Sequence, residues 1–344
     1  MAAARILFRC DAHAALGGGH VARCLTLADA LAERGAQCAF AVNEAAPDWV
    51  PRLARSRHHW MTCQGVAAPS PWSEPADVLI CDHYGFAADE ERALGAGARR
   101  LAAIDDLADR AHACALLIDH NAARTPQDYA GLVPEDCVVL AGARYALIDP
   151  AFAAAGAART PPVSLQRVVV SMGLTDVNGI TARVAEALVQ ARPEFAVDIA
   201  IGPKAQSRAQ VEALAEARPG WRVHVDAGDV AGLMARADLA IGAAGGGALE
   251  RCAAGLPSLI APVAENQMGL AEALNARGAA MRLPADARLG TAIARALDQL
   301  RAAPGLLRVM SDAARQVCDG HGAARAAEAV LALASGDLER AREL

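Results

Sequence analysis

Several features are scarce or missing in this chain of 344 residues. Aromatic residues make up 3%, and no run of Lys or Arg with interleaved aromatics is present. The 33 basic residues are scattered among 39 acidic ones, which gives a formal net charge of -6. A nucleic-acid groove needs clustered positive charge, so we expect no nucleic-acid partner.

Long apolar runs are also missing. No stretch approaches the length that spans a bilayer, and no extended apolar segment lies near Met1. We therefore expect a cytoplasmic protein with no membrane partner. The composition is nonetheless 54% hydrophobic, which over 344 residues supplies the cores of two ordinary domains.

The nine cysteines contain no Cys-x-x-Cys pair, are odd in number and lie mostly in apolar stretches. Such cysteines are typically small buried thiols, and the nine histidines do not cluster with them as zinc ligands would. Acidic residues and His between 105 and 121 resemble metal ligands, but Asp at strand ends and helix starts commonly caps the backbone. We expect no metal and no cofactor.

Short runs of Val, Ile, Leu and Ala alternate with Ala-rich segments of helical period in both halves of the chain. This alternation predicts βαβ units and parallel sheets, and hence an α/β fold. The predicted strands of the first half are 5–10, 38–42, 78–81, 101–104, 116–118 and 138–141. Those of the second half are 167–171, 196–201, 223–225, 239–241 and 259–261.

Residues 150–162 are rich in Ala, Gly and Pro, which predicts neither a helix nor a central strand. We place the domain boundary there, with residues 1–150 and 151–344 forming two domains that face a central cleft. The segment from Thr291 onward is helical in pattern. We assign it to the second domain, with a return of the last helices across the cleft as the alternative.

A first glycine loop, Gly17-Gly18-Gly19, lies between a predicted strand and an amphipathic helix, with His20 at the helix start. The positive end of the helix dipole disfavours an imidazolium, which predicts a neutral His20 able to accept a proton. Taken alone, a tight turn with a capping His explains these residues better. The spacing is not Gly-x-Gly-x-x-Gly, and no acidic residue ends the second strand, so dinucleotide binding is not predicted.

A second glycine loop, residues 242–247, also joins a strand to a helix and suits a diphosphate at the helix N-terminus. Glu250, one turn into that helix, is placed to accept hydrogen bonds from a ribose. An acidic residue favoured by the helix dipole is the alternative.

Two further polar loops follow strands of the second half. Asn266 and Gln267 have the donors and acceptors to bind phosphates or a sugar, and helix capping by Asn266 is the alternative. The loop with Ser171, Gly173 and Thr175 has ordinary turn chemistry as its alternative.

Together, these motifs resemble the UDP-2,4-diacetamido-2,4,6-trideoxy-β-L-altropyranose hydrolases of pseudaminic acid biosynthesis. The matching segments are 9–12, 17–24, 82–84, 104–106, 118–121, 145–150, 171–173, 175–176, 244–246, 248–252, 255–257 and 265–267, in order over nearly the whole chain. The resemblance implies a GT-B fold, with two Rossmann-like domains and UDP held mainly by the second. It also implies metal-independent, inverting hydrolysis of a UDP-sugar at the anomeric carbon.

The resemblance further implies roles for single residues. His20 matches the base that activates water, and Tyr84 and Asn266 match the family's cleft Tyr and Asn. Glu250 matches a glutamate that contacts the uridine ribose in the related transferase that makes lipid II. Leu174 and Gly247 stand where the family usually has Gly and Ser, which leaves the epimer and acyl pattern of the sugar open.

We predict catalytic roles for His20, Asp11 and Tyr84, and whether Asp11 orients His20 stays open. The predicted substrate-binding residues are Gly17, Gly18, Gly19, Arg144, Ser171, Gly173, Thr175, Asp176, Gly245, Gly246, Gly247, Glu250, Asn266 and Gln267. In this hypothesis the second glycine loop holds the diphosphate and the first makes room for the sugar. A GT-B glycosyltransferase and a non-catalytic nucleotide-sugar binding protein are the alternatives, and the oligomeric state stays open.

Overall fold

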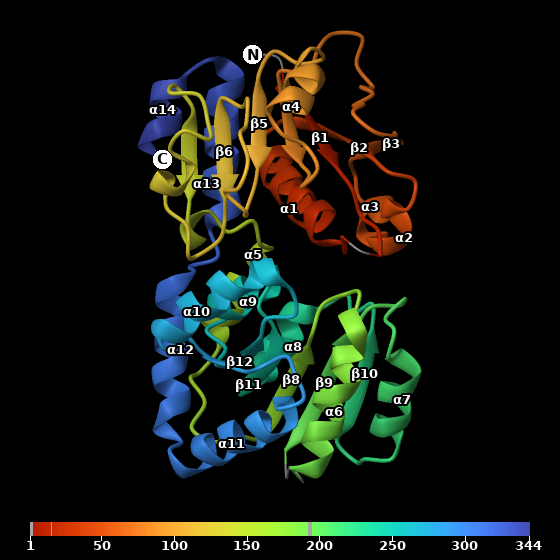
Figure 1. Ribbon diagram of the computed structural model, residues 1–344, viewed down its shortest axis with the longest axis vertical. Helices are drawn as coiled ribbons and strands as arrows, with labels where there is room; N and C mark the ends of the chain where they lie inside the picture. Colours follow the sequence, from red (N-terminus) through yellow and green to blue (C-terminus); the bar gives the residue numbers. More distant parts are fainter. Residues whose placement is uncertain (1–2, 15, 192–194) are drawn as a thin grey trace. The chain divides into compact units, whose positions relative to one another are not determined.

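The computed structural model describes residues 3–14, 16–191 and 195–344. The chain divides into two compact units (Figure 1): unit 1 is residues 1–148 and 321–344, and unit 2 is residues 149–320. Each unit is built on one parallel sheet, which confirms the predicted α/β class. Within the described ranges, no helix combines the length and the apolarity needed to cross a membrane.

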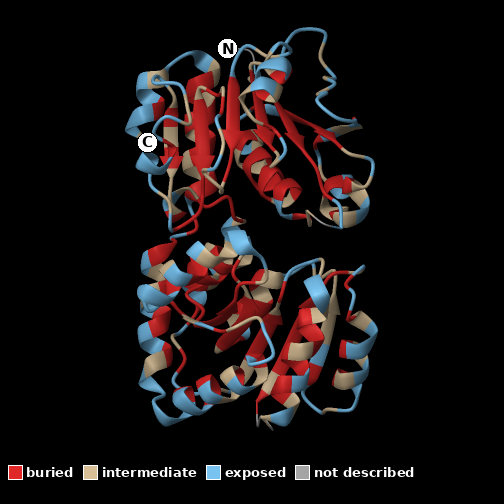
Figure 2. Ribbon diagram, viewed as in Figure 1, coloured by how far each residue is buried: buried red, intermediate tan, exposed pale blue. Residues whose placement is uncertain are grey.

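Unit 1 contains a seven-stranded sheet in the order β3-β2-β1-β4-β5-β6-β7. All neighbouring strands pair in parallel. Its central strands are buried along their length, as expected when helices and loops cover both faces (Figure 2). The strands are β1 (Arg5–Cys10), β2 (Gln37–Val42), β3 (His59–Thr62), β4 (Val78–Asp82), β5 (Leu101–Ile104), β6 (Leu116–Asp119) and β7 (Val138–Ala141).

The last two helices of the chain belong to unit 1. Ala326 and Val330 of α13 (Gly322–Ser335) lie in the same core cluster as Val21 and Leu25 of α1 (Gly19–Glu33). Gly322 allows a close approach, because a Cβ there would lie 2.2 Å from the backbone nitrogen of Ala146. The helices of unit 1 are α1 (Gly19–Glu33), α2 (Ala46–Trp49), α3 (Pro51–Arg55), α4 (Ala88–Gly95), α13 (Gly322–Ser335) and α14 (Leu338–Glu343), with short 3-10 turns η1 (Pro126–Tyr129) and η2 (Ala143–Tyr145).

The assignment of residues 151–344 to one second domain therefore needs a correction, and the structure agrees with the alternative in which the last helices return to the first domain. Residues 321–344 lie in unit 1, because α13 covers the apolar face of α1. The first change of unit falls between Ile148 and Asp149, and unit 2 ends at Gly320.

Unit 2 contains a six-stranded sheet in the order β10-β9-β8-β11-β12-β13, again with parallel pairing throughout. Val168, Val170, Ile199 and Ile241 of three central strands lie in its main core. The strands are β8 (Arg167–Ser171), β9 (Ala196–Ile201), β10 (Trp221–Val225), β11 (Leu239–Ala243), β12 (Ser258–Ala261) and β13 (Ala280–Arg282).

The helices of unit 2 include one that the sequence analysis missed. Residues 150–158 form a helix, whose N-cap Asp149 accepts a hydrogen bond from Ala151 N at 2.9 Å. Pro150 is tolerated there because the first helical position needs no intrahelical donor. The helices are α5 (Pro150–Ala158), α6 (Ile180–Gln190), α7 (Arg208–Glu216), α8 (Val230–Arg236), α9 (Gly246–Ala253), α10 (Met268–Ala276), α11 (Leu289–Ala302) and α12 (Gly305–Val317), with turns η3 (Val177–Gly179) and η4 (Glu265–Gln267).

Two edge strands, β3 and β13, were also missed. β3 places His59 and Thr62 in exposed positions, and β13 has three residues. Neither β3 nor β13 has the apolar run of Val, Ile, Leu and Ala on which the other strand predictions rested.

In each sheet the strand order reverses direction at one point among the described strands. The reversal lies at β1 and β4 in unit 1, and at β8 and β11 in unit 2. Open parallel sheets bind ligands outside the carboxyl ends of the strands at such a point. Both glycine loops follow a strand at a reversal, so the topology marks one candidate site in each unit.

Candidate functional site

The first glycine loop places His20 in the first turn of α1. Gly17 has φ 78° and donates a hydrogen bond from its N to the His13 oxygen at 2.8 Å, which closes the turn. Gly18 is the N-cap, and α1 begins at Gly19. A positive φ favours glycine, so the loop geometry accounts for Gly17 without a ligand.

His20 contacts the carboxylate at the end of β4. Its Nδ1 lies 2.5 Å from Asp82 Oδ1, and both side chains are buried. Parallel pairing of β1 with β4 sets Cys10 opposite Asp82, which brings this strand end beside the first glycine loop. Because a carboxylate accepts, Nδ1 carries a proton, and in the neutral ring Nε2 has the lone pair. Nε2 has no hydrogen-bond partner among the described residues.

Arg23, one turn after His20 on α1, pairs with the same carboxylate. Its Nε donates to Asp82 Oδ2 and its terminal nitrogen to Asp82 Oδ1, both at 2.6 Å, which is a two-pronged pair. Burial raises the pKa of Asp82, but the Arg23 charge and the hydrogen bonds from Arg23 and His20 outweigh it and hold that pKa well below its usual range. Asp82 is therefore an anion at neutral pH.

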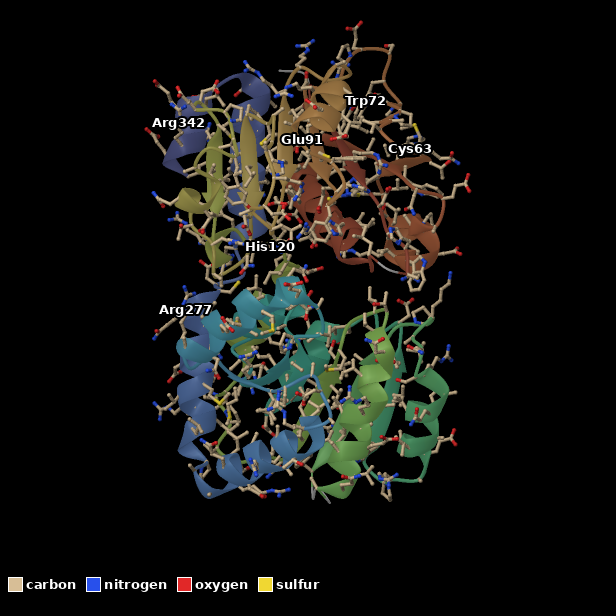
Figure 3. All side chains as sticks on the ribbon, in the orientation of Figure 1. Cys63, Trp72, Glu91, His120, Arg277 and Arg342 are labelled. Atoms are coloured by element: carbon tan, nitrogen blue, oxygen red, sulfur yellow. The ribbon has the colours of Figure 1, made fainter. Side chains whose placement is uncertain are left out.

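Two more groups complete the cluster around Arg23. The guanidinium donates to Asp106 Oδ2 at 3.0 Å and lies 3.2 Å from His120 Nε2. Burial and then the Arg23 charge lower the pKa of His120 to about 4, so this ring is neutral at pH 7 and accepts from Arg23. Figure 3 labels His120, which follows β6 in unit 1. Asp106 Oδ1 and His120 Nδ1 are buried without a partner among the described residues.

Tyr84 packs against the ring of His20. The two rings meet edge to face, with centroids 4.5 Å apart and planes at 83°. The phenol donates to Asp106 Oδ2 at 3.2 Å, and burial raises the pKa of Tyr84. Tyr84 is therefore a neutral hydrogen-bond donor that fixes one side of the His20 ring.

Asp11 does not orient His20, because its carboxylate is held by other residues. Asp11 accepts from Arg9 at 2.5 Å and from Asn43 N at 2.9 Å, and lies 3.3 Å from His83 Nε2. Burial opposes its charge, but the hydrogen bonds from His83 and Arg9 hold the pKa of Asp11 below its usual range. Asp82 occupies the orienting position instead.

A second buried network lies deeper in unit 1 and contains the residues with metal-like spacing. Tyr129 OH lies 2.9 Å from Asp105 Oδ2 and 2.8 Å from Asp119 Oδ2. One hydroxyl proton cannot serve two carboxylates. Burial raises the pKa of Asp119 to about 7, so a proton retained there donates to the phenol, which in turn donates to Asp105. No group of three or more His, Cys, Asp or Glu in the described ranges has a metal-binding arrangement.

His112 ties this network to α4. Its Nδ1 lies 2.7 Å from Glu91 Oε1, and Figure 3 labels Glu91. Burial opposes protonation, but the nearby carboxylates of Asp105, 3.8 Å from Nε2, and of Glu91 prevail and raise the pKa of His112 from 6.5 to about 9. A raised pKa means that the charged ring stabilises the fold below pH 6.5 and loses this effect as the pH rises toward 9.

We therefore predict that the unfolding free energy falls between pH 6.5 and 9. One pKa unit is about 1.4 kcal/mol, so the fall is at most about 3 kcal/mol. Urea unfolding of the wild type and of His112→Gln at both pH values measures it, with the exposed His59→Gln as the control. The His112 variant should lack this component, and an equal fall in both proteins would assign it to other groups.

In unit 2 the second glycine loop leads into α9. Gly245 is the N-cap, so Gly246 and Gly247 form the first turn, where backbone N–H groups have no intrahelical partner. A Cβ at Gly247 would lie 3.5 Å from Glu250 Oε2, so the Glu250 carboxylate lies beside the loop. Binding of a diphosphate by this loop and of a ribose by Glu250 stays a prediction.

Gln267 connects the next strand end to the same loop. Its Oε1 accepts from Val263 N at 3.0 Å, and its Nε2 would lie 3.4 Å from a Cβ at Gly245. Asn266 is the middle residue of η4. The loops after β11 and β12 are thus adjacent at Gly245 and Gln267.

Asp176 does not fit the predicted substrate contact. It is fully buried, with Oδ1 accepting from Thr181 N at 2.8 Å and Oδ2 from Ser207 N at 3.0 Å and from the Ser207 hydroxyl. These bonds hold the loop after β8 on α6, which is a structural role. Ser171, Gly173 and Thr175 remain accessible on that loop, and Gly173 has φ 102°.

Arg144 lies in η2 of unit 1 and is exposed. Its backbone oxygen accepts from Arg325 of α13 at 2.9 Å, and its guanidinium lies 5.9 Å from the Tyr145 ring centre. These contacts give no support to the predicted substrate role.

Sequence reasoning missed the parts that Arg23, Asp82, Asp106 and His120 play. A signal was present for Arg23, since residues three apart share a helix face, which places it beside His20. Asp82 and Asp106 follow neighbouring strands, but nothing in the sequence says that one arginine contacts both.

The solved structures that are similar to this chain define its fold. MurG of Acinetobacter baumannii has a TM-score of 0.65 at 17% identity, covering 95% of this chain and 99% of that one. The calicheamicin glycosyltransferase CalG4 has a TM-score of 0.64 at 16% identity, covering 97% and 99%. The spinosyn rhamnosyltransferase SpnG, complexed with thymidine diphosphate, has 0.63 at 18%, covering 94% and 98%. The protein has the GT-B fold, with two Rossmann-like domains.

In sequence, the chain is similar to a UDP-2,4-diacetamido-2,4,6-trideoxy-β-L-altropyranose hydrolase of Campylobacter jejuni. The two are 28% identical over 186 residues, which is 54% of this chain and 65% of that protein. The match thus spans just under two thirds of the relative's length. No family model matches the chain.

Proposed function

We propose that this protein hydrolyses a UDP-sugar at the anomeric carbon, with inversion and without a metal ion. The observation that carries the proposal is the His20–Asp82 pair, which leaves His20 Nε2 as a proton acceptor at the switch point of unit 1. A base held by a buried carboxylate is what activation of water requires. Similarity to the Campylobacter jejuni hydrolase supports the same reaction.

In the proposed reaction, His20 Nε2 takes a proton from water as the water oxygen bonds to the anomeric carbon. The bond from that carbon to the diphosphate oxygen breaks, and UDP leaves with the electron pair. Asp82 stabilises the imidazolium that forms, since its carboxylate accepts from Nδ1 at 2.5 Å. Attack opposite to the leaving group through an oxocarbenium-like transition state gives inversion.

The leaving UDP is assigned to the second glycine loop. Backbone N–H groups at the start of α9 and the positive end of its dipole stabilise negative charge there. Glu250 is proposed to bind the ribose hydroxyls, with Asn266 and Gln267 near the phosphates or sugar. The substrate is proposed to be UDP-2,4-diacetamido-2,4,6-trideoxy-β-L-altropyranose, as the relative's name indicates. Leu174 is 42% exposed and can contact this sugar.

The test is release of UDP in the absence of any acceptor. A hydrolase releases UDP steadily, and proton NMR detects the inverted anomer of the free sugar first. Several UDP-diacetamido-trideoxyhexoses are compared in parallel to identify the substrate. A glycosyltransferase would release little UDP until an acceptor is added, and a binding protein would return its ligand unchanged. Either of these two results would refute hydrolysis.

A further inference from the structure

A buried arginine lies directly under the second glycine loop. Arg251 is 1% exposed, and its guanidinium turns back from α9 to donate to the Ala243 oxygen at 2.5 Å. A Cβ at Gly242 would lie 2.4 Å from one of its terminal nitrogens, and a Cβ at Gly247 would lie 3.4 Å from the same atom. The guanidinium therefore fills the space that glycine leaves at the end of β11 and reaches the first turn of α9.

The charge on Arg251 has no ionic partner in the described part of the chain. Its Nε is buried without a hydrogen bond, and none of the ion pairs among the described residues includes it. Burial lowers the pKa of Arg251 to about 10, which leaves the guanidinium protonated at neutral pH. A buried cation without a counter-ion lowers the stability of the fold. A bound anion could offset this cost, or the cation could be needed to shape the loop.

The other charges near the loop do not supply that compensation. Glu250 lies beside Gly247. Its charge raises the pKa of Arg251, but by less than burial lowers that pKa. The α9 N-terminus adds partial positive charge to the same loop. The Arg251 guanidinium and the N-terminus of α9 therefore both favour an anion bound at the second glycine loop.

We propose that Arg251 is the counter-charge for the diphosphate of the bound nucleotide and positions it through the glycine loop. The proposal rests on the assignment of UDP to this loop. Arg251 acts as a positioning residue: it fixes the Ala243 carbonyl, which shapes the loop, and its full positive charge attracts phosphates. Affinity should therefore depend on Arg251 in proportion to the number of phosphates on the ligand.

The test compares uridine, UMP and UDP binding by calorimetry for the wild type, Arg251→Met and Arg251→Lys. Arg251→Met should raise the Kd of UDP about 10- to 100-fold, raise that of UMP less, and leave that of uridine within about twofold. Arg251→Lys restores the charge and should recover most of the UDP affinity. Arg222→Met removes an exposed arginine of β10 and serves as the control, with no change expected.

A structural role predicts a different pattern, namely equal losses for uridine and UDP, and this result would overturn the proposal. If Arg251→Met does not fold, Arg251→Lys still decides, because lysine keeps the charge but cannot reproduce the forked contact under Gly242 and at Ala243. Retained preference for UDP over uridine then supports the charge role, and loss of that preference refutes it. If the protein binds UDP but does not hydrolyse the UDP-sugar, the proposed reaction is wrong and the inference about Arg251 still stands. If the wild type binds uridine and UDP with equal affinity, the inference about Arg251 is wrong.

Discussion

Replacement of His20 by Asn is expected to lower turnover on the order of 100-fold or more while UDP binding stays unchanged. Asparagine can still donate an amide hydrogen bond toward Asp82, but it cannot take a proton from water at neutral pH. UDP is assigned to unit 2, whereas His20 lies on α1 of unit 1, so the binding site keeps its residues. Loss of proton transfer without loss of affinity is the signature of a base.

Steady-state release of UDP and calorimetry with UDP measure the two quantities on the same preparations. His59→Asn is the matched control, because His59 is exposed on the edge strand β3 and should leave both quantities at wild-type values. Turnover that persists in His20→Asn would remove His20 from the mechanism. A parallel loss of UDP affinity would point to a folding defect rather than to a missing base.

The second large effect is expected at Asp82. Asp82→Asn removes the acceptor of His20 Nδ1 and one charge of the pair with Arg23. The amide can present an N–H to Nδ1, which moves the imidazole proton to Nε2 and blocks proton acceptance there. Turnover should fall on the order of 10³–10⁴-fold. Because Arg23 stays buried with a weakened partner, the unfolding free energy should fall by about 3–5 kcal/mol.

The pH dependence of stability separates this effect from a general defect. The pKa of Asp82 is lowered in the folded state, so its contribution to stability is present above the ordinary Asp range and is lost as the pH falls below it. The wild type should therefore lose more stability than Asp82→Asn on acidification. Asp89→Asn, an exposed residue paired with Arg92 on the helix surface, is the control. Normal turnover in Asp82→Asn would exclude the orienting role.

The core strands could be predicted because each one is marked by its own residues, without knowledge of its neighbours in the sheet. Val78–Asp82 forms a buried parallel strand, and such strands are marked by an uninterrupted apolar run. The helix at Pro150 was missed because its Ala and Gly residues gave no amphipathic pattern, while its cap is a single Asp. Its stability comes from packing: a Cβ at Gly156 would lie 2.3 Å from the Ala253 oxygen, so α5 lies very close to the end of α9.

The candidate site was predictable in part. A glycine loop before a helix indicated His20, and helix spacing puts Arg23 on its face. The pairing of His20 with Asp82 joins residues 62 positions apart, and that of Arg23 with His120 joins residues 97 apart. Such pairs depend on which strands become neighbours in the sheet. Local sequence patterns do not predict the order of the strands. Asp11 is near His20 in sequence, whereas the pairing of β1 with β4 brings Asp82 to His20.

The return of residues 321–344 to unit 1 has a consequence for how the protein is made. Unit 2 is one continuous segment, inserted between the two parts of unit 1. On a ribosome, residues 149–320 can complete their own core as soon as they emerge. The apolar face of α1 with Val21 and Leu25 must instead wait for α13, which is translated after the whole of unit 2. The unit that carries the proposed base therefore finishes folding after unit 2, although its strand β1 is synthesised before unit 2.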